Sequence, residues 1–116
     1  MAITPTQRSL KLLRDEGWTV AIVEHWQAIP GHPGGGVRKD LFGFGDLMAL
    51  RDGDPPMIIQ TTSGANLAAR RDKIDASLAA KMWLTCGGRI EIHGWRKVKL
   101  GKPIAKWDCK REDYTL

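Results

Sequence analysis

The chain begins with a pattern of apolar and polar positions that is typical of an amphipathic helix. Residues 4–7, TPTQ, combine a capping threonine, a proline suited to a first turn and a glutamine that completes a capping box. Leu10 and Leu13 follow on one face, and Gly17 suits the left-handed residue that ends a helix. These signals predict a helix that runs to about residue 16.

Alternation at period two then replaces the helical pattern. Residues 18–26 place β-branched and aromatic side chains at every second position, which predicts a first strand. Residues 30–36, PGHPGGG, favour a flexible surface loop because proline lacks a donor and glycine resists ordering, with a mobile arm that closes on nucleic acid as the alternative. Residues 41–50 are apolar on both faces and precede a turn signal at 51–56. A buried second strand and a third strand at residues 57–62 therefore form a predicted hairpin.

The second half of the chain returns to helical spacing over residues 66–86. Four apolar residues form the stripe that we expect to be buried: Leu67, Ile74, Leu78 and Met82. Residues 89–98 alternate again, and an optional last strand is expected at 104–110 after a turn at 102–103. The predicted fold is α/β, with a mixed sheet flanked by helices in the order α-β-β-β-α-β, in one domain that spans residues 1–116.

Size and composition narrow the class of protein. With 116 residues and 42% hydrophobic side chains, the chain can build one small core and no second domain. No run approaches the roughly 18 apolar residues of a membrane span, and the amino-terminal pattern is unlike a signal peptide. Cys86 and Cys109 show neither zinc-ligand spacing nor a disulfide framework. We therefore expect a protein of the cytoplasm of a bacterial, archaeal or phage-infected cell, neither secreted nor membrane-bound.

Positive charge is concentrated toward the carboxyl terminus. The net charge is +5, and the residues after Gly88 supply +4 of it, with eight basic against four acidic side chains. Such a patch favours contact with a nucleic acid, although lysine-rich surfaces are also common on other soluble proteins. The candidate nucleic-acid contacts along the whole chain are Arg38, Lys39, Arg70, Arg71, Arg96, Lys97 and Lys99.

Three polar residues on the predicted hairpin carry the candidate chemistry. Gln60 and Thr62 are two apart and project from one face of a strand, and the hairpin places Asp46 beside them. The Asp46 carboxylate, the Gln60 side-chain carbonyl and the Thr61 backbone carbonyl are the oxygen ligands that Mg²⁺ or Mn²⁺ prefers. The hairpin therefore predicts a metal site. Asp46 as a local turn residue and Gln60 as a satisfied core amide are the alternative interpretations.

The same segments resemble a known family. RKDLFGFGDLMAL (38–50), MIIQTTS (57–63) and NLAARRDKI (66–74) are similar to the PD-(D/E)xK nuclease superfamily, the restriction-endonuclease-like group that includes Holliday junction resolvases. Its core is a helix, a three-stranded meander, a helix and a strand. The resemblance implies that Asp46 and Gln60 take the positions of the two acidic motif residues. Some members carry glutamine at the second position.

The resemblance also implies roles for residues beyond the hairpin. Thr62 stands at the position of the family's lysine, and in some members that lysine has moved to the following helix. Lys73 is therefore the candidate that positions the water or balances charge, alongside Asp46 and Gln60 as catalytic residues. Arg70 would hold the scissile phosphate, and Glu24 would add a metal ligand from the first strand. Arg70 and Lys73 also fit a solvated helix face.

One further acidic residue has two interpretations. Asp40, just before the second strand, either helps to hold the metal or pairs with its neighbour Lys39.

These features favour a metal-dependent DNA endonuclease of phage or mobile-element type, which hydrolyses phosphodiester bonds and has branched or structured DNA as one candidate substrate. RNA is not excluded. A homodimer is expected because cutting two strands needs two sites. The alternative is a catalytically degenerate member of the same fold that binds nucleic acid or a replication protein. A purely structural protein is a third class, for which no salt-sensitive DNA affinity is expected.

Overall fold

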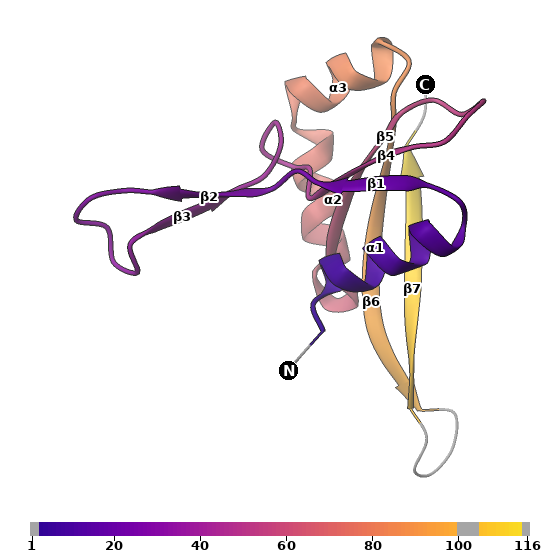
Figure 1. Ribbon diagram of the computed structural model, residues 1–116, viewed down its shortest axis with the longest axis horizontal. Coiled ribbons are helices and arrows are strands. Elements are labelled where there is room, and N and C mark those ends of the chain that lie inside the picture. Colours follow the sequence, from indigo (N-terminus) through magenta and orange to yellow (C-terminus); the bar gives the residue numbers. More distant parts are fainter. Residues whose placement is uncertain (1–2, 100–104, 115–116) are drawn as a thin grey trace.

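The computed structural model describes residues 3–99 and 105–114 of the chain. Within these residues the chain forms seven strands and three α-helices. Five strands form a mixed sheet in the spatial order β1 (Thr19–Ile22), β4 (Leu47–Leu50), β5 (Met57–Ser63), β6 (Arg89–Lys99) and β7 (Ala105–Tyr114) (Figure 1). The two others, β2 (His25–Ala28) and β3 (Gly36–Lys39), pair only with each other. The mixed α/β class predicted from the sequence is confirmed.

The first helix, α1 (Pro5–Asp15), begins and ends as its sequence predicts. The Thr4 hydroxyl accepts a hydrogen bond from the Gln7 backbone N–H at 3.2 Å, and the Gln7 side chain accepts one from the Thr4 N–H at 3.0 Å. These two bonds complete the predicted capping box. Gly17 follows with φ 91°, a left-handed conformation that glycine adopts without strain.

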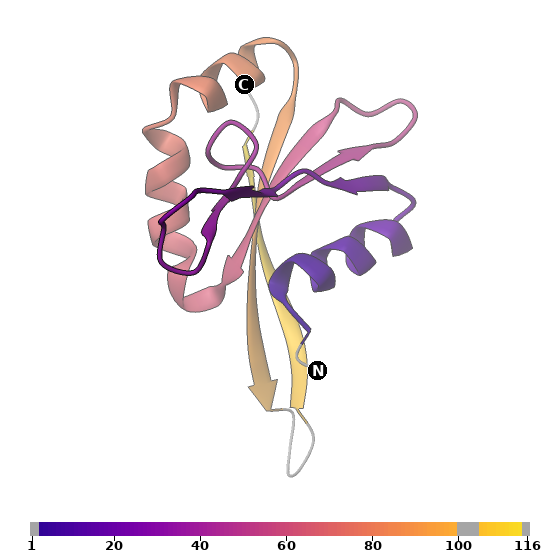
Figure 2. The same cartoon turned by 60° about the vertical axis from the view of Figure 1, so that its left-hand side comes forward.

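Helices cover both faces of the sheet, with α1 on one face and α2 (Leu67–Asp75) with α3 (Leu78–Thr85) on the other (Figure 2). The side chains of β5 alternate between the two layers. Met57 and Ile59 pack in the cluster that includes Leu13 of α1, whereas Ile58 packs with Ile74 of α2. β5 is therefore buried on both faces, which explains its unbroken apolar run.

The pairing pattern accounts for the order of the elements. β4 pairs antiparallel with both β1 and β5, as the predicted hairpin requires, and β7 pairs antiparallel with β6. β5 and β6 are parallel, so the chain must cross over between them, and the 3₁₀ turn η1 (Gly64–Asn66), α2 and α3 form that crossover. The last four residues of β6, 96–99, extend past the end of β5, and β6 and β7 form a long ribbon (Figure 1).

Two predicted strands are shorter in the structure than their sequence patterns indicate. The run 18–26 is interrupted at Val23 and Glu24, where the chain leaves the main sheet and begins β2. The run 41–50 begins with a turn closed by a bridge between Leu41 and Gly45, in which Phe42 has φ 53°. Only its last four residues form a strand. The glycines of this run, which the prediction treated as part of a strand, instead allow the turn.

The predicted helix 66–86 is two helices with a break at Ala76 and Ser77. Ser77 caps α3 through a bond from the Ala80 N–H to its hydroxyl. The break changes which side chains are buried, because the second helix has a new axis. Leu78 and Met82 are 75% and 66% exposed, so the prediction of one continuous buried stripe was wrong for these two residues.

The remaining expectations concern the carboxyl terminus and the membrane. The last strand is present and runs to Tyr114, further than predicted, whereas the predicted turn at 102–103 lies outside the described residues. Cys86 and Cys109 are free thiols. Among the helices of the described part, none is long and apolar enough to cross a membrane.

A buried polar chain ties α1 to the carboxyl-terminal strands. The Trp95 Nε1–H donates to the Ser9 hydroxyl, which also contacts His93 Nδ1, both at 2.8 Å. His93 Nε2 lies 2.8 Å from Glu91 Oε1, which also accepts from Arg111. Ser9 and His93 are fully buried, so no substrate can reach them, and the chain of bonds is structural. Such a network favours one docking position for α1.

The environment of Glu91 makes part of the stability pH-dependent. Burial alone would raise the pKa of Glu91, but its bond with His93 and the charge of Arg111 outweigh burial and hold the pKa below its ordinary value of 4.5. A carboxylate with a lowered pKa stabilises the fold above its ordinary pKa. This contribution is lost as the pH falls through the lowered value.

Replacing Glu91 by glutamine should therefore lower the free energy of unfolding at pH 7 by about 2 kcal/mol, because His93 and Arg111 lose a charged acceptor. The deficit should shrink as the pH falls from about 4.5 through the lowered pKa of Glu91, because the unfolded chain takes up the proton at a higher pH than the folded protein does. Urea unfolding across this pH range measures both effects. Asp113→Asn is the matched control, since Asp113 is half exposed and its bond to Arg89 should contribute less than about 0.5 kcal/mol. Equal losses of stability in the two variants would show that the Glu91 carboxylate does not stabilise the fold through His93 and Arg111.

Candidate functional site

Three carboxylates meet where the β2–β3 hairpin leaves the main sheet. Glu24 precedes β2, Asp40 follows β3, and Asp46 precedes β4. One oxygen from each of them lies within 4.8 Å of the others. Asp46 is only 4% exposed, and the other two are half-buried. The chain therefore places three acidic groups together at the ends of its strands, at a cost in repulsion that calls for a positive partner.

Asp46 is held by β5 through backbone and side-chain bonds. Its N–H donates to the Ile59 carbonyl, and its carbonyl accepts from the Val23 N–H. Its Oδ2 accepts three further bonds, from the Thr61 N–H at 2.7 Å, the Thr61 hydroxyl at 3.1 Å and Gln60 Nε2 at 2.8 Å. The other oxygen, Oδ1, takes part in none of these bonds. The carboxylate is therefore fixed in orientation, with one oxygen left for a ligand.

The pKa of Asp46 is raised to about 7. The main cause is burial, and the neighbouring carboxyl groups of Glu24 and Asp40 add to it, whereas the Thr61 N–H acts in the opposite direction. Because the ordinary value is 3.8, folded Asp46 keeps a proton that the unfolded chain has released. The stability should consequently fall as the pH rises from about 4 to 7. A bound cation would remove this penalty.

Gln60 supplies an observation independent of the acidic cluster. The side chain is 2% exposed, and its Oε1 is buried without a hydrogen-bond partner in the described residues. A buried amide oxygen without a partner costs about 1–3 kcal/mol, and such groups in native proteins usually have an explanation. Three carboxylates with one amide oxygen form an all-oxygen donor set, which suits a hard cation such as Mg²⁺, Mn²⁺ or Ca²⁺. The residues present therefore fit the predicted metal.

Basic residues surround these acidic groups in a cavity of about 290 Å³. Arg38 lies 3.4 Å from Glu24, and Lys73 Nζ lies 3.4 Å from Asp40 Oδ2. Arg70 lines the cavity, and its Nε is buried without a partner in the described part of the chain. The lining residues are Thr4, Pro5, Thr6, Glu24, Arg38, Asp40, Asp46, Gln60, Thr61 and Arg70. An anion such as a phosphate would find arginine donors beside the candidate metal ligands.

The structure brings most of the predicted core site together but changes two details. Thr61 contacts Asp46 through its N–H and hydroxyl, which are donors, so its carbonyl stays only a predicted ligand. Thr62 is buried, and no hydrogen bond joins it to Asp46 within the described residues. Asp40 pairs with Lys73 and lies in the acidic cluster, which favours the first of its two interpretations over a pair with Lys39.

The other candidate nucleic-acid contacts lie outside this cavity. Lys39 is opposite His25 in the β2–β3 hairpin, and Arg71 donates to Glu112 of β7 with 2.8 Å between Nε and Oε2. Arg96 lies 3.7 Å from Asp108, and Lys97 is opposite Trp107 in the ribbon of β6 and β7. Lys99 ends β6, and its side chain lies outside the described residues. The basic patch expected after Gly88 is thus partly neutralised by ion pairs.

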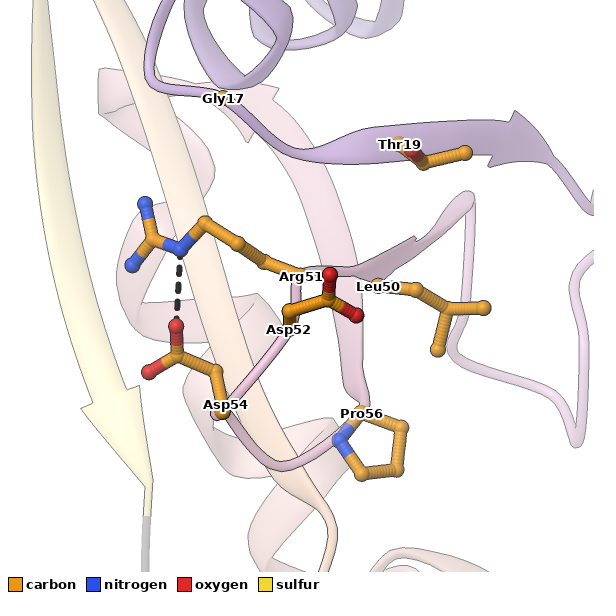
Figure 3. Close-up of a pocket in the computed structure, with 8 residues that line it drawn as sticks. Gly17, Thr19, Leu50, Arg51, Asp52, Asp54 and Pro56 are labelled. Carbon is orange, nitrogen blue, oxygen red and sulfur yellow. Dashed lines mark hydrogen bonds and ion pairs between the residues drawn. The ribbon is translucent and has the colours of Figure 1, made fainter.

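A larger hollow lies elsewhere and offers no comparable chemistry. It measures about 650 Å³ and is lined by Gly17, which follows α1, by the start of β1, and by the end of β4 with the turn between β4 and β5 (Figure 3). The Arg51 Nε donates to Asp54 at 2.8 Å, and the guanidinium also stacks on Trp18. These contacts give the Arg51 guanidinium an acceptor and a stacking partner and close the turn. Arg51 in this hollow therefore has a structural role.

Comparisons of the chain with protein-family models, with curated proteins and with solved structures find no match. The function must therefore be argued from the site itself.

The raised pKa of Asp46 makes metal affinity depend on pH. Since the cation must displace the proton from Asp46, the affinity for Mn²⁺ should rise by up to about ten-fold per pH unit below 7 and level off above it. Isothermal titration calorimetry between about pH 5.5 and 8.5 measures this profile. Asp46→Asn should bind weakly at every pH, whereas Asp52→Asn, an exposed turn residue, should reproduce the parent profile. A parent profile that is flat below pH 7 would contradict the assignment.

Proposed function

We propose that this protein is a metal-dependent nuclease that hydrolyses phosphodiester bonds in DNA. The observation that carries the proposal is the convergence of three carboxylates in a cavity lined by arginine and by buried Gln60, whose Nε2 bonds to Asp46 and whose Oε1 has no partner in the described residues. Oxygen ligands for a hard cation next to guanidinium groups are the components that phosphoryl chemistry requires.

In this proposal the carboxylates of Glu24, Asp40 and Asp46 and the Oε1 of Gln60 hold the cation. When bound, the ion would neutralise charge on the phosphate and make a neighbouring water more acidic. The chain's own contribution is orientation. Three hydrogen bonds to Asp46 Oδ2 hold the carboxylate before any ligand arrives, so little reorganisation is needed when the substrate binds.

Arg38, Arg70 and Lys73 are the proposed phosphate contacts. Arg38 and Lys73 neutralise Glu24 and Asp40 at 3.4 Å in the structure. A divalent cation on these carboxylates would release both basic groups toward the phosphate. The Nε–H of Arg70 is buried and has no acceptor in the described residues. In this proposal it would donate a hydrogen bond to a phosphate oxygen. Lys73 then balances charge as the phosphodiester bond breaks.

The order of the elements supports the resemblance to the PD-(D/E)xK nucleases. Leaving aside the β2–β3 hairpin, the chain runs as a helix, a three-stranded meander, a helical crossover and the strand β6, after which β7 is added at the edge. Asp46 lies immediately before the second strand of the meander and is hydrogen-bonded to Gln60 on the third. Thr62 is too short to replace a lysine, and Lys73 on α2 approaches the same cluster. A homodimer is proposed because each chain offers one such site.

The first test is cleavage of supercoiled plasmid and four-way junctions in Mg²⁺ or Mn²⁺. Cleavage should occur with the parent and fall at least about a hundred-fold in Asp46→Asn, which removes the central charged ligand. Asp52→Asn is the matched control and should cleave normally, since it lies in the exposed turn between β4 and β5. Binding without cleavage under any metal would favour the alternative of a catalytically inactive nucleic-acid-binding protein.

The second test separates Lys73 from an ordinary surface lysine. Lys73→Ala should lower kcat by about a hundred-fold, with KM changing less, because its proposed role is in the transition state. The same change should strengthen Mn²⁺ binding by removing the cation that neutralises Asp40. Lys81→Ala, on the exposed surface of α3, should change neither quantity. Normal kcat in Lys73→Ala would leave this lysine without its proposed role.

A further inference from the structure

The β2–β3 hairpin, residues 25–39, extends away from the body of the protein (Figure 1). Its two strands pair only with each other, and every residue of β2 is exposed. A two-stranded sheet without a covered face gains little stability from burial. Glu24 immediately precedes the hairpin and Asp40 immediately follows it, and both belong to the three carboxylates of the cluster. Its position next to the site therefore needs an explanation other than packing.

Trp26 lies on the same face of the hairpin as Arg38, a residue that lines the cavity. Trp26 and Arg38 are directly opposite each other in the antiparallel pair, so their side chains project from the same face. Arg38 lines the cavity and reaches Glu24. Trp26 is 57% exposed, and neither arginine–tryptophan stack in the described residues includes it. A large aromatic surface is thus open to solvent beside the proposed phosphate site.

The charge of the hairpin identifies the kind of partner. Residues 25–39 contain Arg38 and Lys39 and no aspartate or glutamate. Positive charge with an exposed tryptophan suits a polyanion with flat apolar faces, which describes an unpaired stretch of nucleic acid. Paired bases are stacked on each other within a duplex, so their faces are covered. The hairpin therefore fits unpaired nucleotides better than a duplex.

We propose that the β2–β3 hairpin binds single-stranded nucleic acid, with Trp26 stacking on an unpaired base adjacent to the phosphate held by Arg38. The inference rests on the proposed function for the phosphate in the cavity, and it narrows the substrate class to nucleic acid with unpaired nucleotides at the cleavage site. Stacking on tryptophan has little dependence on base identity, so the recognition would be of structure and not of sequence.

Fluorescence anisotropy with a fluorescein-labelled oligothymidylate tests this inference without requiring cleavage. The strand should exceed the roughly 4–16 nucleotides that a single-strand site covers. The buffer should contain Ca²⁺, which accepts the same oxygen ligands. Trp26→Ala should weaken binding by about ten-fold, and Trp26→Phe by much less, because phenylalanine still stacks. A duplex of the same length should bind equally to the parent and to Trp26→Ala.

Phe42→Ala is the matched control, since Phe42 is 60% exposed but lines an apolar groove with α3 instead of the acidic cavity. It should leave binding of both probes unchanged. The inference is overturned if the parent does not bind the single strand, if Trp26→Ala binds it normally, or if Phe42→Ala weakens binding as much. Plasmid cleavage with the Asp46→Asn control reports the nuclease separately. If the protein binds the single strand through Trp26 but never cleaves DNA, the binding role of the hairpin is supported and the proposed nuclease activity is wrong.

Discussion

The arrangement of the candidate site depends on one costly interaction, the burial of Asp46 beside two other carboxylates. Burial and like charge both oppose ionisation, and they raise the pKa of Asp46 to about 7. A group needed only for turn geometry would not require Glu24 and Asp40 beside it. A divalent cation converts the repulsion among the three groups into attraction. In the proposed metal complex the Oε1 of Gln60, which has no partner in the described residues, would coordinate the same cation.

Each layer of the fold contributes one part of this site. The central strand β5 supplies Gln60 and the donors of Thr61, the roots of the hairpin supply Glu24 and Asp40, and α2 supplies Arg70 and Lys73. The residues of the cluster itself lie at the ends of strands or just beyond them, where the backbone turns and side chains from different elements can converge. The buried pairing of β4 with β5 keeps Asp46 and Gln60 in register, so the rigid sheet positions the less rigid parts.

Local signals in the sequence predicted much of this architecture. The capping box of α1, the hairpin of β4 and β5 and the strand β6 depend on short-range chemistry, and each is present. The break between α2 and α3 and the turn at residues 41–45 were missed, because apolar composition there agrees with both a continuous element and an interrupted one. Exposure of Met82 follows from that break.

In the site too, contacts within the predicted hairpin could be expected from the sequence, whereas contacts between residues far apart in sequence could not. Asp46 and Gln60 could be paired from hairpin geometry, and they do form a hydrogen bond. The sequence did not decide the inclusion of Asp40, because it depends on how the chain re-enters the sheet after the β2–β3 hairpin, of which residues 30–36 were predicted as a surface loop and residues 25–26 as the end of the first strand. Likewise, the contact between Ser9 and His93 joins residues far apart in sequence, with no local pattern to announce it.

A crystal structure determined from crystals soaked in Mn²⁺ would show whether Glu24, Asp40, Asp46 and Gln60 bind a metal. We expect one anomalous peak within about 2.5 Å of carboxylate oxygens of Glu24, Asp40 and Asp46 and of Gln60 Oε1. Lys73 should then have moved away from Asp40. A peak elsewhere, or no peak with Asp46 still hydrogen-bonded as in the metal-free protein, would contradict the assignment of this cluster as a metal site.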